Sequence, residues 1–318
     1  MKVLVVGGAG YIGSHTVYEL LRANHEVVVL DNLSTGHRSF VPSQVKFYEG
    51  DITKKEDIEK VFKNEKIDAV MHFAAKIVVP ESVGKPLDYY YNNVEGVRVL
   101  LECVVEHGIK RFVFSSTAAV YGDAKGVCHE DDVLAPINPY GETKLAVEKM
   151  IKWTANAYDL SYVVFRYFNV AGADKTLEIG YKNNKATHLI PIANEAALGI
   201  RDQLNIYGND YDTEDGTCIR DYVHVTDLAQ AHVLGVEYLE KGGASKTMNL
   251  GSNKGFSVLE VVKTLEKITP VKYAYAPRRD GDPALLVASN DQAKKVLGWE
   301  PKLTLEDMIK SDLAYHKK

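Results

Sequence analysis

Short apolar runs alternate with longer amphipathic segments through the first half of the chain. The runs are rich in β-branched and aromatic residues and are apolar at successive positions, as strands covered on both faces require. They predict strands at residues 3–6, 27–31, 45–48, 69–73, 111–115 and 162–166. The segments between them predict helices at residues 12–23, 55–65, 89–107 and 141–158. This alternation predicts an α/β fold built on a doubly wound parallel sheet.

The alternation weakens after Ala171. Residues 174–186 are polar and irregular, and residues 208–218 are rich in turn-forming side chains. Further helices are predicted at residues 188–199, 226–239, 257–267 and 304–316, with a short strand at 247–250. We therefore expect a first domain over residues 1–173 and a smaller domain over residues 174–318.

The predicted helix at residues 89–107 is apolar around most of its circumference. Its charged residues Glu95, Arg98, Glu102 and Glu106 step by three or four positions and form one narrow polar stripe. Valine and leucine fill much of the remaining surface, so the helix must be covered on more than one side. The cover is either the rest of the same chain or a second subunit, and the pattern leaves both open.

The composition of the 318 residues is that of an ordinary globular protein. Apolar side chains make up 46%, and 43 acidic against 38 basic residues give a net charge of −5, which offers no electrostatic footprint for nucleic acid. No run of 18 apolar residues could span a membrane, and the run at residues 3–6 is too short for a signal peptide. Cys103, Cys128 and Cys218 form no paired motif, so a reducing cytoplasm is the expected location.

Glycines cluster where the first predicted strand meets the first helix. Residues 7–13 read Gly-Gly-Ala-Gly-Tyr-Ile-Gly and fit both GxGxxG and GxxGxxG. Such glycines let the backbone approach a pyrophosphate closely, while the helix N-terminus supplies positive potential. Asp31 ends the second strand 18 positions after Gly13, where a carboxylate can accept hydrogen bonds from an adenosine ribose. Because that carboxylate repels a 2′-phosphate, NAD is favoured over NADP, although His37 and Arg38 lie close in sequence.

Tyr140 and Lys144 are four positions apart and share one face of a predicted helix. A free tyrosine has a pKa near 10, and a nearby ammonium favours its phenolate form as a general base. The strand at residues 111–115 ends in the hydroxyl cluster Ser115, Ser116 and Thr117. This cluster is expected at the carboxyl edge of the sheet, where such folds bind ligands.

Together these motifs resemble the extended short-chain dehydrogenases/reductases, and within them the UDP-glucose (UDP-galactose) 4-epimerases. The resemblance covers essentially the whole chain. Besides the glycine loop it rests on residues 50–52, 72–75, 90–93, 115–122, 139–141, 166–169, 207–225 and 278–282. It implies a Rossmann-type domain with a smaller, interleaved C-terminal substrate-binding domain, in which residues 217–251 return to the first domain.

The resemblance also implies roles for individual residues. Tyr140, Lys144 and Thr117 would be catalytic. Tightly bound NAD, regenerated in each turnover, would be held by Gly7, Gly10, Tyr11, Ile12, Gly13, Asp31, Asn32, Asp51, Ile52, Phe73, Ala74, Ala75, Asn93, Ser115, Tyr140, Lys144 and Tyr167. The UDP-sugar would be held by Thr117, Tyr140, Asn169, His188, Leu189, Asn205, Tyr207, Arg220, Arg279 and Asp282. The arginines suit a diphosphate, which calls for fixed cationic donors.

The implied reaction is epimerisation at C4 of UDP-galactose or UDP-glucose through a transient 4-keto sugar. Related nucleotide-sugar dehydratases carry an acid pair after the hydroxyl residue, whereas this chain has Ala118 and Ala119, which favours epimerisation. A 4-epimerase acting on UDP-N-acetylglucosamine, UDP-N-acetylgalactosamine or UDP-glucuronate is the alternative. A non-catalytic NAD-binding sensor is a third interpretation, and the tyrosine–lysine pair argues against it.

Two positions depart from the family pattern. Ile77 stands where some epimerases have a lysine, so a cationic contact to the cofactor is missing or rearranged. Leu286 stands where some members have a tyrosine, and the smaller side chain predicts room for N-acetylated UDP-sugars. The scattered histidines imply no metal site. A homodimer formed through helices 89–107 and 141–158 is expected.

Overall fold

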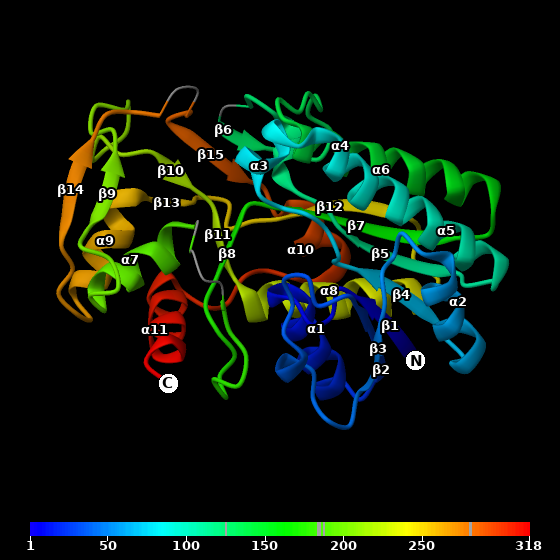
Figure 1. The fold of residues 1–318 in the computed structure, drawn as a ribbon. Coiled ribbons are helices and arrows are strands. Elements are labelled where there is room, and N and C mark those ends of the chain that lie inside the picture. Colours follow the sequence, from blue (N-terminus) through cyan, green and yellow to red (C-terminus); the bar gives the residue numbers. More distant parts are fainter. Residues whose placement is uncertain (125, 183–185, 187, 280–281) are drawn as a thin grey trace. The chain divides into compact units, whose positions relative to one another are not determined.

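The computed structural model describes residues 1–124, 126–182, 186, 188–279 and 282–318 (Figure 1). Asp280 and Gly281 of the motif at 278–282 lie outside the described residues. The chain divides into two compact units: the first comprises residues 1–122, 133–166 and 229–248, and the second comprises residues 123–132, 167–228 and 249–318. In this division residues 123–132 lie outside the first unit and residues 229–248 return to it. The predicted boundary at residue 173 and the returning segment 217–251 stay predictions.

The main sheet confirms the predicted doubly wound arrangement. In the described residues its strands are β1 (Lys2–Val6), β2 (Glu26–Asp31), β3 (Lys46–Glu49), β4 (Ala69–His72), β5 (Arg111–Ser115), β7 (Ser161–Tyr167) and β12 (Lys246–Leu250). Their order is β12-β7-β5-β4-β1-β2-β3, and the neighbours from β7 to β3 are parallel. The winding reverses between β1 and β4, and ligands of such sheets bind outside the carboxyl ends of the strands at this reversal.

Helices cover both faces of this sheet. They are α1 (Tyr11–Arg22), α2 (Lys55–Asn64), α3 (Val79–Gly84), α4 (Pro86–Tyr89), α5 (Gly96–Glu106), α6 (Pro139–Ala157) and α8 (Val225–Glu240), with short 3₁₀ turns η1 (Arg38–Phe40) and η3 (Ala118–Tyr121). Neighbouring residues of β7 reach the two layers: Val164 joins the buried cluster of α2, α5 and α6, whereas Phe165 contacts His232 of α8. In Figure 1, α4, α5 and α6 lie together on one side of the strands.

The helix predicted over residues 89–107 is interrupted. The chain forms α4 as far as Tyr89, then a π-helical turn, η2 (Tyr90–Glu95), and then α5. A π turn closes wider hydrogen-bonded rings than an α turn, so residues on either side of it leave the regular helical spacing. The apolar residues of α5 are buried within the first unit, with Val97 and Leu100 at most 1% exposed. The sequence left open whether the same chain or a second subunit covers these residues, and the structure shows that the same chain does.

The second unit holds α7 (Leu189–Ala197), α9 (Val258–Glu266), α10 (Asp291–Leu297) and α11 (Leu305–His316). Its short strands are β6 (Gly126–Cys128), β8 (Asn169–Ala171), β9 (Leu204–Tyr207), β10 (Ile219–Arg220), β11 (Tyr222–His224), β13 (Phe256–Ser257), β14 (Tyr273–Ala276) and β15 (Leu285–Ala288). Within the described residues they form one sheet of order β13-β10-β15-β6 and the pairs β11-β8 and β14-β9.

A separate apolar core holds the second unit together, with Ile190 of α7, Val262 of α9 and Met308 of α11 buried in it. The four helices predicted after residue 187 are confirmed as α7, α8, α9 and α11. The strands of the second unit escape prediction because they have only two to four residues and no regular alternation with helices marks them. None of the helices in the described ranges has the length and apolar character needed to span a bilayer.

Candidate active site

The glycine loop between β1 and α1 has no space for side chains at two positions. Gly7 has a φ of +82°, and a Cβ there would lie 2.5 Å from the backbone nitrogen of Ala74. A Cβ on Gly13 would lie 2.1 Å from the carbonyl oxygen of Gly7. Gly10 precedes Tyr11 and Ile12, the first residues of α1, and brings no capping side chain to their N–H groups. The loop therefore fits a dinucleotide pyrophosphate, which needs close backbone approach and a helix N-terminus.

Asp31 ends β2, and both of its carboxylate oxygens bind backbone N–H groups. Oδ2 accepts from the nitrogen of Ala9 at 2.9 Å, and Oδ1 accepts from that of Leu33 at 2.8 Å. Burial raises the pKa of the Asp31 carboxyl, although these two bonds oppose the rise. Asp31 thus ties the glycine loop to β2, and each oxygen keeps a further lone pair that a ribose hydroxyl could use.

Asn32 and Asp51 lie together beyond the ends of β2 and β3. Asn32 Nδ2 donates to Asp51 Oδ2 at 3.1 Å, and the hydroxyl of Thr53 donates to Asp51 Oδ1 at 2.8 Å. Burial acts to raise the pKa of Asp51, but hydrogen bonds from Thr53 and Asn32 hold it below its usual value. The neighbouring Ile52 is buried against Gly96, where a Cβ would lie 2.7 Å from the Ile52 side chain.

The loop after β4 carries Phe73, Ala74 and Ala75 and meets the glycine loop at the reversal of the sheet. Asn93, in η2, braces this loop. Its Oδ1 accepts from the nitrogen of Lys76 at 2.8 Å, and its Nδ2 donates to the carbonyl of Lys76 at 3.0 Å and to Thr143 Oγ1 at 3.1 Å. The amide is therefore occupied by the chain itself, and a direct contact between Asn93 and NAD stays a prediction.

Tyr140 lies in the first turn of α6. The helix begins there because the Asn138 side chain accepts from the nitrogen of Gly141 at 2.9 Å and Pro139 fills the first position. Burial raises the pKa of Tyr140, and the neighbouring hydroxyl of Thr117 opposes that rise. Tyr140 and Thr117, both predicted as catalytic residues, lie close together beyond the end of β5.

Lys144 is buried one turn farther along α6. Its Nζ donates to the carbonyl oxygen of Ser115 at 2.8 Å and lies 4.9 Å from the ring centre of Phe114. Burial lowers the pKa of Lys144 to about 7, although the charge of Glu148 opposes the shift. The ring of His72 stacks on that of Phe114, with the ring centres 5.9 Å apart. Burial, with the charge of Lys144, lowers the pKa of His72 to about 3, so this histidine is neutral.

Sequence reasoning missed a buried ion pair beside these residues. Arg166 of β7 donates to Glu148 of α6 through Nε at 3.0 Å and through NH2 at 2.6 Å. Ser116 Oγ donates to the same carboxylate at 2.5 Å, and Arg166 NH1 donates to the hydroxyl of Tyr121 at 3.0 Å. Two signals were present: Glu148 follows Lys144 by four positions, and Arg166 interrupts an otherwise apolar run.

The residues predicted for the UDP-sugar belong to the second unit, apart from Thr117 and Tyr140. Arg220 pairs with Asp282, with NH2 and Oδ1 2.9 Å apart. The guanidinium carbon of Arg279 lies 4.0 Å from the ring centre of Tyr207. Tyr207 and Asn205 alternate with buried residues along β9 and share its exposed face.

The other residues of that prediction are more dispersed in the second unit. Asn169 of β8 donates its amide to the carbonyl of Asp221 at 2.9 Å. His188 precedes Leu189, the first residue of α7, and burial lowers the pKa of the His188 ring. Tyr167, predicted for the cofactor, is the last residue of β7 and is buried.

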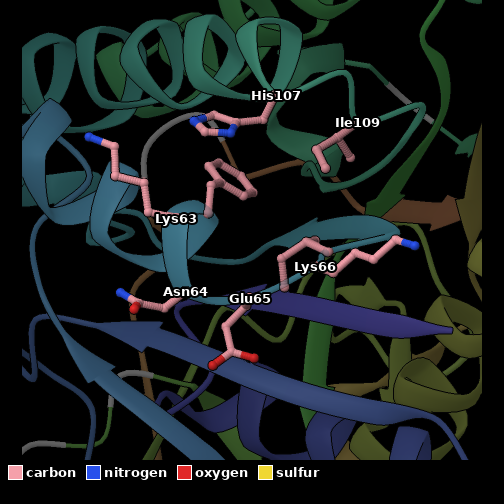
Figure 2. Close-up of a pocket in the computed structure, with 8 residues that line it drawn as sticks. Lys63, Asn64, Glu65, Lys66, His107 and Ile109 are labelled. Carbon is pink, nitrogen blue, oxygen red and sulfur yellow. The ribbon is translucent and has the colours of Figure 1, made fainter.

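A pocket of about 350 Å³ lies elsewhere in the first unit (Figure 2). Its lining residues Lys66 and Ile109 precede β4 and β5, so it opens at the amino edge of the sheet, opposite the groups described above. The nearby Glu59, Cys103 and Glu106 bring possible metal-ligand atoms within 4.8 Å of one another. The carboxylates already pair with cationic or hydrogen-bonding side chains of the chain: His107 with Glu59 and Lys55 with Glu106.

Comparison with known proteins gives consistent matches over the full length. The UDP-glucose 4-epimerase of Halalkalibacterium halodurans is 51% identical and is aligned over 100% of this chain and 96% of its own. The crystal structure of UDP-glucose 4-epimerase from Brucella ovis in complex with NAD is 45% identical, with a TM-score of 0.96 over 99% of this chain and 98% of its own. The UDP-Glc/GlcNAc 4-epimerase of Campylobacter jejuni is 44% identical, with a TM-score of 0.89 over 99% of each chain. Residues 3–251 match the NAD dependent epimerase/dehydratase family, and the chain belongs to that family.

Proposed function

We propose that the protein interconverts UDP-galactose and UDP-glucose by transient oxidation at C4 of the sugar, with NAD as its bound cofactor. The observation that carries the proposal is the arrangement at the carboxyl end of β5, where Tyr140 meets Thr117 and Lys144 meets the carbonyl of Ser115. Membership of the NAD dependent epimerase/dehydratase family supports it, as do the relatives named UDP-glucose 4-epimerase.

Tyr140 is the group that takes and returns the proton of the C4 hydroxyl. The hydroxyl of Thr117 lies near its phenol and can position the sugar hydroxyl or relay its proton. The ammonium of Lys144, one helical turn away, favours the phenolate. When bound, NAD supplies the acceptor and donor of the hydride at C4.

The chain's own residues hold the cofactor and the nucleotide. The glycine loop and the N-terminus of α1 receive the pyrophosphate of NAD, and Asp31 receives the ribose. Arg220 and Arg279 receive the diphosphate of the UDP-sugar, because guanidinium groups match phosphate oxygens in charge and geometry. Asp282 pairs with Arg220 through NH2, and Arg220 NH1 donates to the carbonyl of Ile219.

Epimerisation is favoured over dehydration by the residues that follow Thr117. Ala118 and Ala119 begin η3, and neither supplies a carboxyl group. Elimination of water from a 4-keto sugar needs a general acid and base, which these positions lack. The sugar is therefore reduced again rather than dehydrated.

A wider substrate range has one supporting observation. Leu286 of β15 pairs in register with Arg220 of β10, so it lies beside an arginine proposed to bind the diphosphate. A leucine leaves more room there than a tyrosine. The Campylobacter jejuni relative is named for both UDP-Glc and GlcNAc. We propose that N-acetylated UDP-sugars are also accepted.

One experiment tests the main proposal. The purified protein is denatured and its supernatant is examined for NAD, and the native protein is incubated with UDP-galactose without added cofactor. Proton NMR of the sugar should show UDP-glucose accumulating to equilibrium. Bound NAD without any conversion of UDP-galactose or of N-acetylated UDP-sugars would support the sensor instead.

We also propose a homodimer and a cytoplasmic location. The apolar residues of α5 are covered by the first unit, so the contact would instead use Leu87, Tyr91 and Trp153, which are 80%, 60% and 72% exposed on α4, η2 and α6. Sedimentation at micromolar concentration should give a dimer that Leu87→Lys weakens; a monomeric wild type would refute it.

The cytoplasmic location is supported by three buried, free cysteines, because a reducing compartment keeps thiols unpaired.

A further inference from the structure

Three consecutive residues at the end of β5 contact three residues of α6 that are spaced four apart. The contacts of Ser115 and Thr117 belong to the proposed reaction. The contact of Ser116, the residue between them, has no assigned role. The three contacts are Ser115 with Lys144, Ser116 with Glu148, and Thr117 with Tyr140. Ser116, the middle one of the three consecutive residues, is thus bound to Glu148, which lies farthest along α6 of the three helix residues.

The contact of Ser116 with Glu148 is built into a buried ion pair. The side chains of Arg166 and Glu148 are 4% and 7% exposed, and Ser116 is 2% exposed. Arg166 engages both carboxylate oxygens. Desolvation cancels much of the stabilisation that a buried ion pair provides, so stability alone gives a weak account of this arrangement.

We propose that Glu148 is a positioning residue for the active site. Arg166 holds its carboxylate in place, and that carboxylate holds Ser116. The residues on either side of Ser116 are thereby fixed: the carbonyl of Ser115 where it meets Lys144, and the side chain of Thr117 beside Tyr140. The inference rests on the proposed function of the site, because it assigns a task within that reaction.

Glu148 also acts on the charge of Lys144. The carboxylate favours the ammonium form, against the effect of burial. Of the other titratable groups, His72 of β4 feels the charge of Lys144 and is neutral, while Arg166 of β7 lies against Glu148. Without the negative charge of Glu148, Lys144 should lose its proton more readily.

Two variants separate the mechanical and electrostatic effects. Ser116→Ala removes the hydrogen bond and keeps the ion pair, and it should lower kcat roughly 10-fold with little change in KM for UDP-galactose. Glu148→Gln should lower kcat at least as much and should also lower the pKa of Lys144 by about one unit. That pKa is read by NMR of ¹³C-lysine-labelled protein, with the signal assigned through Lys144→Met. Ser116→Ala should leave it unchanged.

The matched control is Glu65→Gln. Glu65 is also a buried carboxylate in the first unit, paired with Lys2 at 3.1 Å and Lys46 at 2.6 Å, but it lies at the amino edge of the sheet. Glu65→Gln should lower Tm without changing kcat or the pKa of Lys144.

The inference is overturned if Ser116→Ala and Glu148→Gln behave like this control. If Glu148→Gln does not fold, the kcat of Ser116→Ala decides alone. If the wild type does not epimerise any UDP-sugar, the proposed function fails. The positioning role falls with it, and the Lys144 pKa then shows separately whether Glu148 acts on that charge.

Discussion

The charged groups proposed for proton transfer in the first unit and for diphosphate binding in the second lie in opposite settings. In the first unit, Lys144 and the pair of Glu148 with Arg166 are all less than a tenth exposed. In the second, Arg220 and Asp282 are paired but remain 13% and 32% exposed. Burial shifts the proton affinity of a group, whereas a partly exposed cation keeps its charge and can exchange its partner for a ligand. The first setting suits proton transfer, and the second suits anion binding.

The largest effect that this comparison predicts is on turnover, in Tyr140→Phe. Loss of the phenol removes the acid–base group, so kcat should fall roughly 10²-fold or more with little change in KM for UDP-galactose. Steady-state assays measure both constants. Tyr158→Phe, at the exposed end of the same helix, should match the wild type. Near-normal kcat in Tyr140→Phe would mean that another group moves the proton.

A smaller effect is expected from a change in the second unit, and it should appear in KM instead of kcat. Arg220→Met removes a cation from the proposed diphosphate site and should raise KM for UDP-galactose roughly 10-fold, with a lesser change in kcat. Arg278→Met is the control, because Arg278 is exposed and paired with Asp210 at 2.6 Å. If Arg220→Met lowered kcat and left KM unchanged, the division of labour between the units would be wrong.

Substrate choice tests the second unit more finely. Leu286→Tyr should reduce kcat/KM for UDP-N-acetylgalactosamine relative to UDP-galactose by roughly 10-fold, because the larger ring fills the space of the acetyl group. Leu286→Ile keeps the side-chain volume and should keep the ratio. The two substrates are assayed in parallel with each variant. A ratio that is the same in all three proteins would place the sugar away from residue 286.

The smallest expected effect is on stability, and it tests whether the first unit is tuned by burial. In the folded protein, burial lowers the pKa of Lys144 to about 7, so the side chain loses its proton above that pH. In the unfolded chain, a lysine keeps its proton up to a pH of about 10. The unfolded chain therefore binds more protons between these values, and wild-type stability rises with pH there.

Lys144→Met removes this contribution. Its stability relative to the wild type should be most favourable near pH 6.5 and should decline towards pH 10, as measured by urea unfolding. Lys149→Met, at an exposed position of α6, should show no such trend. A pH-independent difference for Lys144→Met would contradict the lowered pKa.

The parts of the site that follow from local rules could be predicted from the sequence. The glycine loop is fixed by adjacent residues, and the pairing of Tyr140 with Lys144 follows from helical spacing. Most strands of the main sheet are apolar runs, and the predicted positions of its strands agree with the structure within about two residues.

What could not be predicted depends on partners far apart in the chain. Ser116 and Glu148 are separated by 32 positions, and Glu148 and Arg166 by 18. No periodic pattern marks such contacts, because the fold alone brings them together. The π turn at η2 is missed for a related reason: its composition is that of a helix, and the seating of Asn93 against Lys76 and Thr143 is a tertiary interaction.

The start of α6 has a consequence for engineering. Asn138 and Pro139 set the first turn themselves, so the register of the helix does not depend on the length of the preceding connection. The stretch before this helix contains β6 (Gly126–Cys128), which pairs with β15 in the sheet of the second unit. Substitutions in β6 would therefore alter that sheet without rotating Tyr140 away from Thr117. Variants of the second unit can thus be made while the reaction chemistry stays as it is.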